Sequence, residues 1–435
     1  MARVQIPVDA WDILKKRDND SMLDIKLIRE NPEAVRKSLE RRRSDYPLDT
    51  LIEIDKNWRE NLKEMERLKA LRNKVSLEMA KVKDQTKIRE MKKVNDDIKK
   101  LEIEVGKLEA QEREMLLSIP NILHESVPDG AGEEDNPVIR SWGKAEKPAF
   151  KLKDHVDAAI DLDLLDMERA AKVSGARFYY LKNDLVKLDY SIMMFALDHL
   201  IAKGYVPIEP PYMLMRKPFE GAVILSDFGD VIYKIEGEDL HLIGTSEHAL
   251  AAMHMDEVLD SLPLKYAGIS PCFRKEAGAH GKDTKGIFRV HQFNKVEQFI
   301  FCKPKDSWKY HEELIKNAEE LFQKLELPHR VITLCSGETG KVAAKTYDLE
   351  VWMAAQGKYR EAVSASNCTD YQARRLNVKY LEGSKREFVH TLNSTAVATS
   401  RALVAILENN QQKDGSILIP EALQDYMGKK VIKRK

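Results

Sequence analysis

Residues 51–116 constrain the fold of this chain more than any other segment, because their composition permits little except long helices. The segment holds no proline and a single glycine, Gly106, and it is dominated by residue types that favour the helical conformation. In its second half, apolar residues recur in alternating steps of three and four, which is the spacing of a coiled-coil seam. The residues of this seam are Met91, Val94, Ile98, Leu101, Val105 and Leu108.

The first half of the segment has a looser apolar pattern, which includes Ile54 and Trp58 and extends to Val82. Between the two halves, Lys83-Asp84-Gln85-Thr86 is a candidate turn. We therefore expect an antiparallel hairpin of two helices, that is, a coiled-coil arm. Each helix of roughly 30 residues would be about 45 Å long at a rise of about 1.5 Å per residue.

Positive charge gathers around the expected turn of this arm. Eight lysines and arginines lie there against three acids, Glu78, Asp84 and Glu90. Two interpretations stay open: a solvated face of a coiled coil, or an arm that contacts the phosphates of a nucleic acid. The basic residues are Arg72, Lys74, Lys81, Lys83, Lys87, Arg89, Lys92 and Lys93.

Bulk composition limits the class of protein. The chain has 435 residues, which suggests two or three domains, and its formal net charge is zero. A neutral chain has no general attraction to nucleic acid, so any such contact requires a local patch. The four cysteines form no C-x-x-C pair, which argues against a zinc cage and against a disulfide scaffold. We therefore expect a reduced, cytoplasmic enzyme.

The chain divides into four expected segments. Residues 1–21 are polar and irregular and form an extra N-terminal segment without an assigned role, and residues 22–117 form a helical domain with its arm. Residues 118–147 carry prolines, glycines and an acidic run and are expected as a linker, whereas residues 148–435 show a mixed α and β pattern. No run of 18 apolar residues occurs, so we expect no membrane-spanning helix.

The second half of the chain carries two candidate strands, Pro271–Glu276 and Arg289–Glu297, joined by a loop of small and charged residues. Their arginines suit a phosphate, because the planar guanidinium donates two parallel hydrogen bonds. The ring of Phe293 suits the face of a purine. Carboxylates suit magnesium, an ammonium group or a hydroxyl. The two strands therefore suggest a site for ATP and a small polar molecule.

Three further segments allow either a structural or a functional interpretation. Thr245-Ser246-Glu247 precedes a predicted helix and is either an N-cap or a group that holds an ammonium. Glu361 and Ser364 are either part of a strand edge or ligands for a metal and for phosphates. Arg401 stands near the start of an apolar helix, where an unpaired charge is costly. A nucleotide phosphate or a carboxylate would supply the counter-charge that Arg401 needs.

Several runs together carry a resemblance to a known family. The helical half opens with Met22–Pro32, the expected linker holds Ile119–Ile122, and a further run is Glu168–Phe178. Three motifs then follow in order: Lys203–Pro211, the strand pair described above, and a segment that ends at Arg401. With the helical hairpin, these runs resemble the seryl-tRNA synthetase family of class II aminoacyl-tRNA synthetases.

The resemblance implies an α+β fold. In it, an N-terminal antiparallel helical hairpin binds tRNA through its basic residues, and a C-terminal antiparallel β-sheet flanked by helices forms the class II catalytic domain. The implied reaction is ATP-dependent activation of L-serine to seryl-adenylate and transfer to tRNA(Ser), with tRNA(Sec) as a second candidate acceptor. The implied metal is Mg2+. The implied assembly is a homodimer, with the first motif at the interface.

The resemblance also assigns roles to residues of the nucleotide site. Arg274 is expected to clamp the α-phosphate of ATP, Phe293 to stack on adenine, and Arg401 to meet the γ-phosphate. Arg274, Glu361 and Arg401 are the implied catalytic residues, and Glu361 and Ser364 the implied ligands of the metal. The full implied ATP site is Arg274, Lys275, Glu276, Arg289, Val290, Phe293, Glu361, Ala362, Val363, Ser364 and Arg401.

For the amino acid, the resemblance implies that Thr245 and Glu247 receive the ammonium of serine and that its hydroxyl meets Glu297 and Thr395. The full implied serine site is Thr245, Ser246, Glu247, Arg274, Glu297 and Thr395. Two alternatives stay open: a ligase that loads an amino acid onto a carrier protein, and a non-catalytic paralogue. The first would lack a long arm, and the second would be expected to lose residues such as Arg274 or Arg401.

Overall fold

The computed structural model describes residues 23, 25–79, 85–224, 231–276 and 285–434. Its contacts divide the chain into two compact units. The first comprises the chain up to Glu40 together with Ser44–Pro120, and the second comprises Arg41–Arg43 together with Asn121–Lys435. The predicted segment 1–21 lies outside the described residues, as do Lys81 of the basic group and Lys83 and Asp84 of the expected turn.

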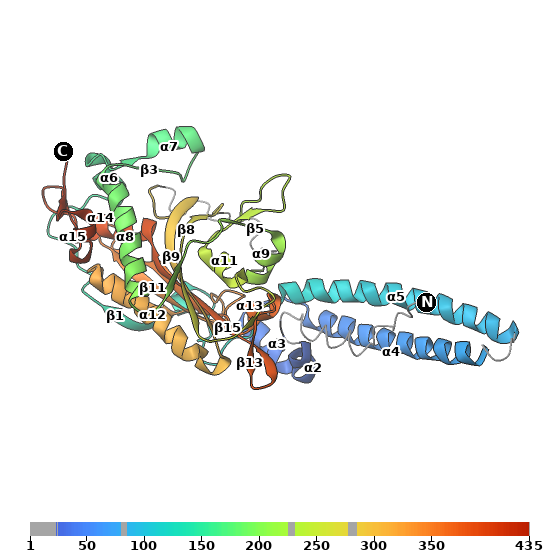
Figure 1. Cartoon of the computed structure of the whole chain (residues 1–435). Helices are drawn as coiled ribbons and strands as arrows, with labels where there is room; N and C mark the ends of the chain where they lie inside the picture. The colour runs from blue at the N-terminus through green and yellow to red at the C-terminus, as the bar shows by residue number, and fades with distance from the viewer. Residues whose placement is uncertain (1–22, 24, 80–84, 225–230, 277–284, 435) are drawn as a thin grey trace. The chain divides into compact units, whose positions relative to one another are not determined.

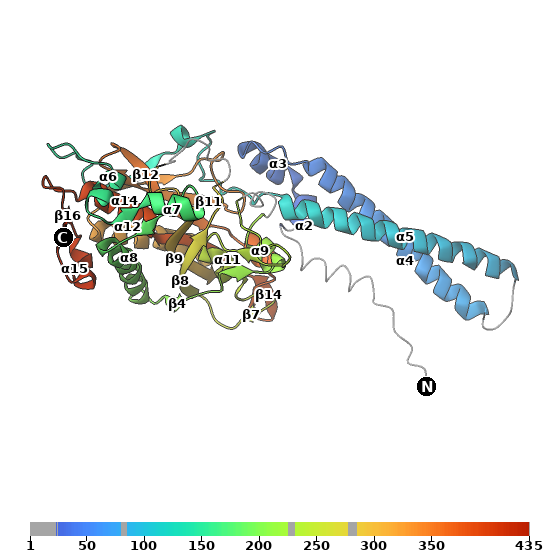
Figure 2. The same ribbon diagram turned by 90° about the horizontal axis from the view of Figure 1, so that it is seen from above.

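The main feature of the first unit is a hairpin of two long helices (Figure 1). Helix α4 (Leu48–Met79) and helix α5 (Gln85–Ser118) lie side by side, as Figure 2 also shows, so the predicted hairpin is confirmed. Because α5 already begins at Gln85, that residue and Thr86 belong to the helix and not to the expected turn. Two short helices, α2 (Ile25–Glu30) and α3 (Pro32–Arg41), precede the hairpin in the chain.

The predicted seam holds the two long helices together near their base. Trp58 is fully buried there. Nearby, the buried carboxylate of Asp55 accepts hydrogen bonds from Arg29 at 2.6 Å and from Arg59 at 2.9 Å, which ties α2 to α4. The residues of the apolar cluster are Trp58, Leu62, Met65, Val105 and Leu108. Alternating steps of three and four therefore predicted the helix contact correctly.

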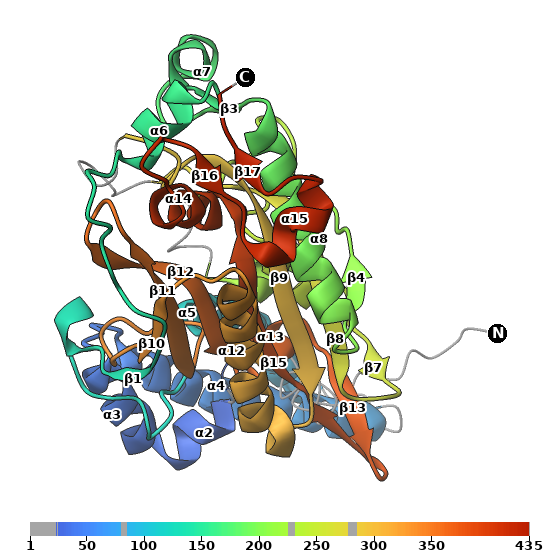
Figure 3. The same ribbon diagram turned by 90° about the vertical axis from the view of Figure 1, so that its left-hand side faces the viewer.

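The second unit is built on an eight-stranded sheet with the order β1-β10-β11-β12-β15-β9-β8-β4 (Figure 3). Its neighbouring strands are antiparallel, except that β4 runs parallel to β8. The expected α+β class is thus confirmed. In the order of the sheet, the strands are β1 (Val138–Trp142), β10 (His329–Thr333), β11 (Lys345–Met353), β12 (Lys358–Asn367), β15 (His390–Ala398), β9 (Gln292–Cys302), β8 (Leu264–Phe273) and β4 (Val206–Ile208).

Three long helices cover one face of this sheet (Figure 3). They are α8 (Asp184–Ile201), α12 (Ser307–Lys324) and α14 (Thr399–Asn409). Side chains alternate along β9, so Val296 and Ile300 pack into the core with these helices, whereas Lys295 and Glu297 line a pocket on the other face. On that other face lie the short helices α9 (Arg216–Ala222), α11 (Ser246–Ala252) and α13 (Tyr371–Arg375).

Three strands of the sheet, β1, β12 and β15, carry one residue more than the strand they pair with, and the last two border the pocket described below. In β12 the extra residue is Ala362, opposite the β11 pair Leu349 and Glu350. In β15 it is Ala396, between residues that pair with consecutive positions of β9. Each is a β-bulge, which sets two residues against one and shifts the alternation of side chains by one position. Residues three positions apart can therefore share one face of the sheet.

Arg42 belongs to the second unit although it directly follows α3. Its guanidinium is buried and donates hydrogen bonds only to backbone carbonyls among the described residues, at Asn121 (2.9 Å), Thr339 (2.8 Å), Gly340 (3.2 Å) and Ala343 (2.5 Å). Burial lowers the pKa of Arg42 to about 10, so the side chain stays charged at neutral pH. It fixes the segment 339–343 beside the pocket described below.

The remaining elements are short. Segment 118–147, which we expected as a linker, contains the edge strand β1. Within the described ranges, no helix combines the length and the apolar character needed to cross a membrane. The short elements are α6 (His155–Asp161), α7 (Met167–Ser174), α15 (Glu421–Met427), β2 (Leu165–Asp166), β3 (Tyr180–Leu181), β5 (Met213–Leu214), β6 (His241–Leu242), β7 (Val258–Leu259), β13 (Lys379–Glu382), β14 (Lys385–Phe388), β16 (Ile417–Leu418) and β17 (Val431–Ile432), with single 3-10 turns at Glu133–Asp135 and Pro304–Asp306.

Candidate active site

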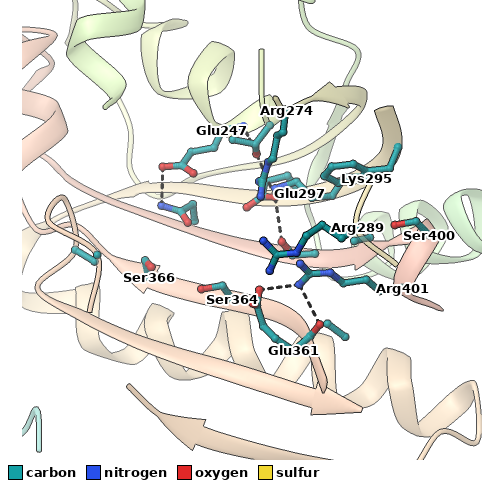
Figure 4. A pocket seen from close by; sticks show the side chains of 18 of the residues that line it. Glu247, Arg274, Arg289, Lys295, Glu297, Glu361, Ser364, Ser366, Ser400 and Arg401 are labelled. Atoms are coloured by element: carbon teal, nitrogen blue, oxygen red, sulfur yellow. Dashed lines mark hydrogen bonds and ion pairs between the residues drawn. The ribbon is translucent and has the colours of Figure 1, made fainter. Parts of the chain in front are cut away.

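One pocket on the second face of the sheet gathers most of the residues predicted for ATP and serine (Figure 4). Its walls come from β9, β12 and β15, from the chain after β8, and from the starts of α11 and α14. The predicted residues that line it are Thr245, Glu247, Arg274, Glu276, Arg289, Val290, Phe293, Glu297, Glu361, Ala362, Ser364, Thr395 and Arg401. Segments far apart in the sequence therefore meet in one place.

Three predicted site residues have side chains outside the lining of this pocket, as far as the described residues show. The Ser246 hydroxyl donates a hydrogen bond to the Gly268 carbonyl at 3.4 Å, beneath the start of α11. The ammonium of Lys275 lies 5.7 Å from the centre of the Tyr233 ring. Val363 is buried in the core, because it follows the bulge residue of β12 and points to the helix-covered face.

Arg274 and Phe293 form one end of the pocket. The guanidinium carbon lies 5.5 Å from the centre of the Phe293 ring, and Nε donates a hydrogen bond to the Gly244 carbonyl at 3.1 Å. Within the described part of the chain, no carbonyl or carboxylate takes up the two terminal nitrogens. Arg274 is therefore held in place by its inner nitrogen, and its fork can bind a phosphate or a carboxylate.

Arg289 lies close to this end of the pocket, and its Nη1 donates a hydrogen bond to Glu276 Oε2 at 3.3 Å. The imidazole of His291 contacts the carbonyl of Arg274 at 2.8 Å. Val290, which stands between Arg289 and His291 in the sequence, is buried. The two predicted strands thus lie against each other, and their charged residues other than Lys275 line the pocket.

Arg401 and Glu361 form a pair across the pocket (Figure 4). Nη1 of Arg401 donates to Glu361 Oε1 at 2.8 Å and to the Glu361 carbonyl at 2.9 Å. Burial alone would raise the pKa of Glu361, but Arg401, Arg274 and Arg289 hold it below its ordinary value. Because the Glu361 side chain is 49% exposed, solvent screens this pair, and a ligand can reach both groups. The predicted counter-charge of Arg401 is a carboxylate in this structure.

Oxygen ligands for a divalent cation lie next to this pair. The bulge at Ala362 puts Glu361 and Ser364 on the same side of β12. Opposite Ser364 lies Asp348, which is 8% exposed and whose Oδ1 has no partner among the described residues. No group of three or more His, Cys, Asp or Glu within those residues could hold a metal. Mg2+ commonly binds one or two carboxylates together with substrate phosphates, so these residues fit it.

Glu247 lies at the opposite end of the pocket, in the first turn of α11. The Thr245 hydroxyl caps this helix by accepting a hydrogen bond from the Glu247 backbone N–H, so the predicted cap is confirmed. The Glu247 side chain accepts hydrogen bonds from the amides of Gln372 and Asn393, each at 3.0 Å. Burial, reinforced by nearby Glu297, raises the pKa of Glu247 to about 7. Among the described residues its hydrogen-bond partners are neutral amides, so this carboxylate is suited to receive an ammonium group.

Glu297 lies beside Glu247 and is 2% exposed. Its Oε2 forms an ion pair with Lys295 and accepts hydrogen bonds from the hydroxyls of Thr245 at 3.5 Å and Thr395 at 3.4 Å. The hydroxyls come from α11 and β15, so three elements converge on one carboxylate oxygen. A small ligand with a hydroxyl and an ammonium would find partners for both groups here.

Sequence reasoning did not single out Lys295, Gln372 and Asn393, although they contact the predicted glutamates. A signal for two of them existed. Lys295 lies two positions from both Phe293 and Glu297 on β9, and Asn393 lies two positions from Thr395 on β15. Residues two positions apart in a strand share a face of the sheet, so Lys295 and Asn393 each share a face with a predicted residue. Gln372 lies in α13, and nothing in the sequence near it points to the pocket.

Comparisons with known proteins agree with this site. Residues 22–123 match the family model described as the seryl-tRNA synthetase N-terminal domain. Residues 232–410 match the model of the tRNA synthetase class II core domain for G, H, P, S and T. The chain is 53% identical over 416 residues to a serine–tRNA ligase of Nitrosopumilus maritimus, an alignment that covers 94% of this chain and 99% of the relative.

Solved structures give the same result. A seryl-tRNA synthetase from Pyrococcus horikoshii, complexed with ATP, has a TM-score of 0.91 and 50% identity, with 95% of this chain and 100% of that one covered. A cytoplasmic serine–tRNA ligase from Naegleria fowleri, in complex with AMP, has a TM-score of 0.86 and 42% identity, with 95% and 99% covered. The chain belongs to the seryl-tRNA synthetase family of class II aminoacyl-tRNA synthetases.

Proposed function

We propose that this protein activates L-serine with ATP and transfers the seryl group to tRNA(Ser), as a serine–tRNA ligase does. The observation that carries the proposal is the content of one pocket: three arginines at one end and, at the other, Glu247 and the buried Glu297. The arginines suit a triphosphate and the glutamates suit a small amino acid with a hydroxyl. Relatives of this chain have been solved with ATP and with AMP.

Each group has a proposed role at the nucleotide end. Arg274 clamps the α-phosphate, and Phe293 stacks on adenine, whose edge meets Glu276 and the backbone at Val290. Arg289 and Arg401 neutralise the outer phosphates, so Glu361 exchanges its bond to Arg401 for a ligand contact. The remaining predicted ATP contacts, Lys275, Ala362 and Val363, are proposed to act through their backbone, since Lys275 and Val363 have side chains that point elsewhere.

The reaction has two steps. The serine carboxylate attacks the α-phosphorus, and pyrophosphate leaves, which gives seryl-adenylate. The terminal ribose hydroxyl of the tRNA then attacks the seryl carbonyl, and AMP leaves. The pocket residues bring the reactants together and neutralise charge that develops on the phosphate oxygens.

Mg2+ is the proposed metal, and Glu361 and Ser364 are its proposed protein ligands. When bound, the ion draws charge from the phosphate oxygens and orients the triphosphate. The two protein oxygens stand on one side of β12 because of the bulge at Ala362. Asp348, opposite Ser364, is the neighbouring buried carboxylate.

Selectivity for serine is proposed to rest on Glu297 and Thr395. Alanine has no hydroxyl and would leave these buried groups without a partner. A site built to bind a hydroxyl rejects an analogue that lacks it by roughly a thousandfold or more. Thr245 and Glu247 are proposed to receive the ammonium of the same amino acid, and Arg274 its carboxylate.

A homodimer is proposed, and an apolar stripe on α8 supports it. Val186, Tyr190, Met194 and Ile201 follow one another at helical spacing and are 38%, 60%, 43% and 44% exposed. Near them in the sequence, Val206 of the edge strand β4 is 52% exposed. Such a run of exposed apolar side chains is typical of a protein interface.

The proposed location is the cytoplasm. All four cysteines are buried and carry free thiols, as expected in a reducing compartment. The carrier-protein ligase and the non-catalytic paralogue find no support in the comparisons. Among the described residues, the pocket retains Arg274, Glu297, Glu361 and Arg401.

The decisive experiment is a screen of amino-acid-dependent exchange of pyrophosphate into ATP, with each of the common amino acids as substrate. We expect exchange with serine and, at least about a hundredfold weaker, with alanine. Aminoacylation of tRNA(Ser) and tRNA(Sec) transcripts then tests the second step and the choice of acceptor. A protein that activates no amino acid, or prefers another one, would refute the proposal.

A further inference from the structure

Lys295 is the cation at the serine end of the pocket that the reaction above does not use (Figure 4). It lies two positions before Glu297 on β9 and shares its face of the sheet. The residue is 5% exposed, and its ammonium forms an ion pair with Glu297 Oε2. Lysine is rarely buried without a specific partner, so this position requires an explanation.

The surroundings of Lys295 are almost entirely pocket residues. The charged or titratable groups around it are Glu297 on its own strand, Glu247 and His248 of α11, and Cys272 and Arg274 at the end of β8. Glu297 is buried and Glu247 is half-buried, and Lys295 and Arg274 are the cations that act on Glu247. If the lysine served the fold alone, its partner would not need to be a residue that faces the ligand.

Among the described residues, the bonds to the Glu297 side chain meet at one of its oxygens. Lys295, Thr245 and Thr395 each reach Oε2. A carboxylate fixed by one oxygen in this way presents the other in a defined direction. In the ionised form that second oxygen can only accept a hydrogen bond, which is what a substrate hydroxyl offers.

We propose that Lys295 is a positioning residue for serine recognition: it holds the Glu297 carboxylate in the orientation that accepts the hydroxyl of the substrate. The inference rests on the proposed function. It predicts that Lys295 controls the choice between serine and alanine without touching the reacting atoms. Its effect should therefore appear in the KM for serine and should leave the KM for ATP nearly unchanged.

The test compares three variants of the full chain in pyrophosphate exchange. Lys295→Met keeps the length of the side chain and removes its charge, and Lys295→Arg restores a charge. The matched control is Lys265→Met. Lys265 lies on β8 of the same sheet and also pairs with a glutamate, Glu313 of α12 at 2.7 Å, but away from the pocket lining. Thermal melting and ATP binding report whether each variant is folded.

For Lys295→Met we expect kcat/KM for serine to fall about 100-fold or more, since the loss of one partner of a buried ion pair has an effect of that size. The value for alanine should change less than about threefold, so the preference for serine falls by nearly the same factor. Lys295→Arg should recover most of it, and Lys265→Met should match the wild type. A Lys295→Met protein that keeps the wild-type ratio of serine to alanine overturns the inference.

A further variant keeps the test decisive if Lys295→Met unfolds. Lys295→Met/Glu297→Gln leaves no unpaired buried charge. If Lys295 acts through Glu297, this double variant loses as much serine activity as Glu297→Gln alone. Losses that multiply would instead show that Lys295 acts independently and would overturn the inference. A wild-type chain without any serine-dependent exchange would refute the proposed function itself, a result distinct from both.

Discussion

At the scale of single residues, Glu247 and Glu297 of the pocket differ in what surrounds them. Glu247 accepts hydrogen bonds from two neutral amides, whereas Glu297 is paired with a lysine. Burial and the nearby charge of Glu297 raise the pKa of Glu247 to about 7. In the empty site, Glu247 therefore exchanges a proton near neutral pH, and it stays a carboxylate when a cationic group binds.

We predict that the KM for serine rises as the pH falls below about 7, because protonated Glu247 no longer attracts an ammonium group. Well below the pKa, KM should rise about tenfold per pH unit. The measurement is pyrophosphate exchange at saturating ATP across this range. Glu247→Gln should have a high KM that changes little with pH, and a pH-independent KM in the wild type would contradict the assignment.

The same raised pKa of Glu247 gives folding of the ligand-free chain the opposite dependence on pH. A carboxyl whose pKa is raised in the folded state binds its proton more tightly there than in the unfolded chain. Its contribution to stability is therefore lost as the pH rises towards about 7. Serine binding and folding thus favour different protonation states of Glu247.

Arg274 gives the second prediction at this scale. Arg274→Ala should lower the rate of pyrophosphate exchange by roughly a thousandfold or more, because the α-phosphate loses its clamp. The fold should survive, since this guanidinium makes one hydrogen bond, to the Gly244 carbonyl, within the described residues. Circular dichroism and thermal melting check the fold. Arg169→Ala, whose side chain is 78% exposed, is the control, and exchange at the wild-type rate in Arg274→Ala would refute the role.

At the scale of elements, we propose that the helical hairpin and the sheet carry separate functions. Among the described basic residues near the tip, Lys87 pairs with Glu78 at 3.0 Å. The apolar cluster that joins the helices lies near their base. The tip can therefore be changed without touching the buried core of the hairpin.

Deletion of about Arg72–Lys93, closed by a short turn, should leave pyrophosphate exchange with serine unchanged and lower aminoacylation of tRNA by about 100-fold or more. The physical reason is the loss of cations that meet phosphates, away from the ATP pocket. Neutralising Lys87, Arg89, Lys92 and Lys93 should give the same result, whereas neutralising Lys56 and Lys63 should not. Equal loss of both activities, or of neither, would count against a tRNA-binding arm.

The elements also show how far sequence reasoning reaches. Steps of three and four between apolar residues were enough to predict the hairpin, because burial of a helix seam depends on spacing alone. Glu361 and Ser364 were candidates, yet they stand three positions apart, which in a regular strand means opposite faces. The bulge at Ala362 brings them together. It depends on pairing with β11, and the local sequence does not show it.

At the scale of the whole molecule, the chain consists of two compact units. The pocket lies in the second unit, and the predicted nucleic-acid contacts lie in the first. The exposed apolar stripe of α8 is a third feature, on neither the pocket nor the arm. A catalytic unit that exposes such a stripe is expected to cover it with another protein surface.

We predict that Tyr190→Glu/Met194→Glu converts a dimer into a monomer, since it places two charges in the centre of the stripe. The dissociation constant should rise by about 100-fold or more, as measured by sedimentation equilibrium. Ile103→Glu changes an apolar residue that is 74% exposed on α5 and should leave the assembly unchanged. A wild-type chain that sediments as a monomer would remove the basis of the proposed homodimer.

Because Arg42 belongs to the catalytic unit, that unit is not one continuous stretch of chain. Four carbonyls near or within the wall of the pocket, those of Asn121, Thr339, Gly340 and Ala343, depend on a guanidinium that is encoded about eighty residues before the unit resumes. A shortened protein that starts at Asn121 would leave these acceptors without their donor, at about 1–3 kcal/mol for each one that stays buried. The tip of the arm can be removed, but Arg42 cannot be separated from the catalytic unit.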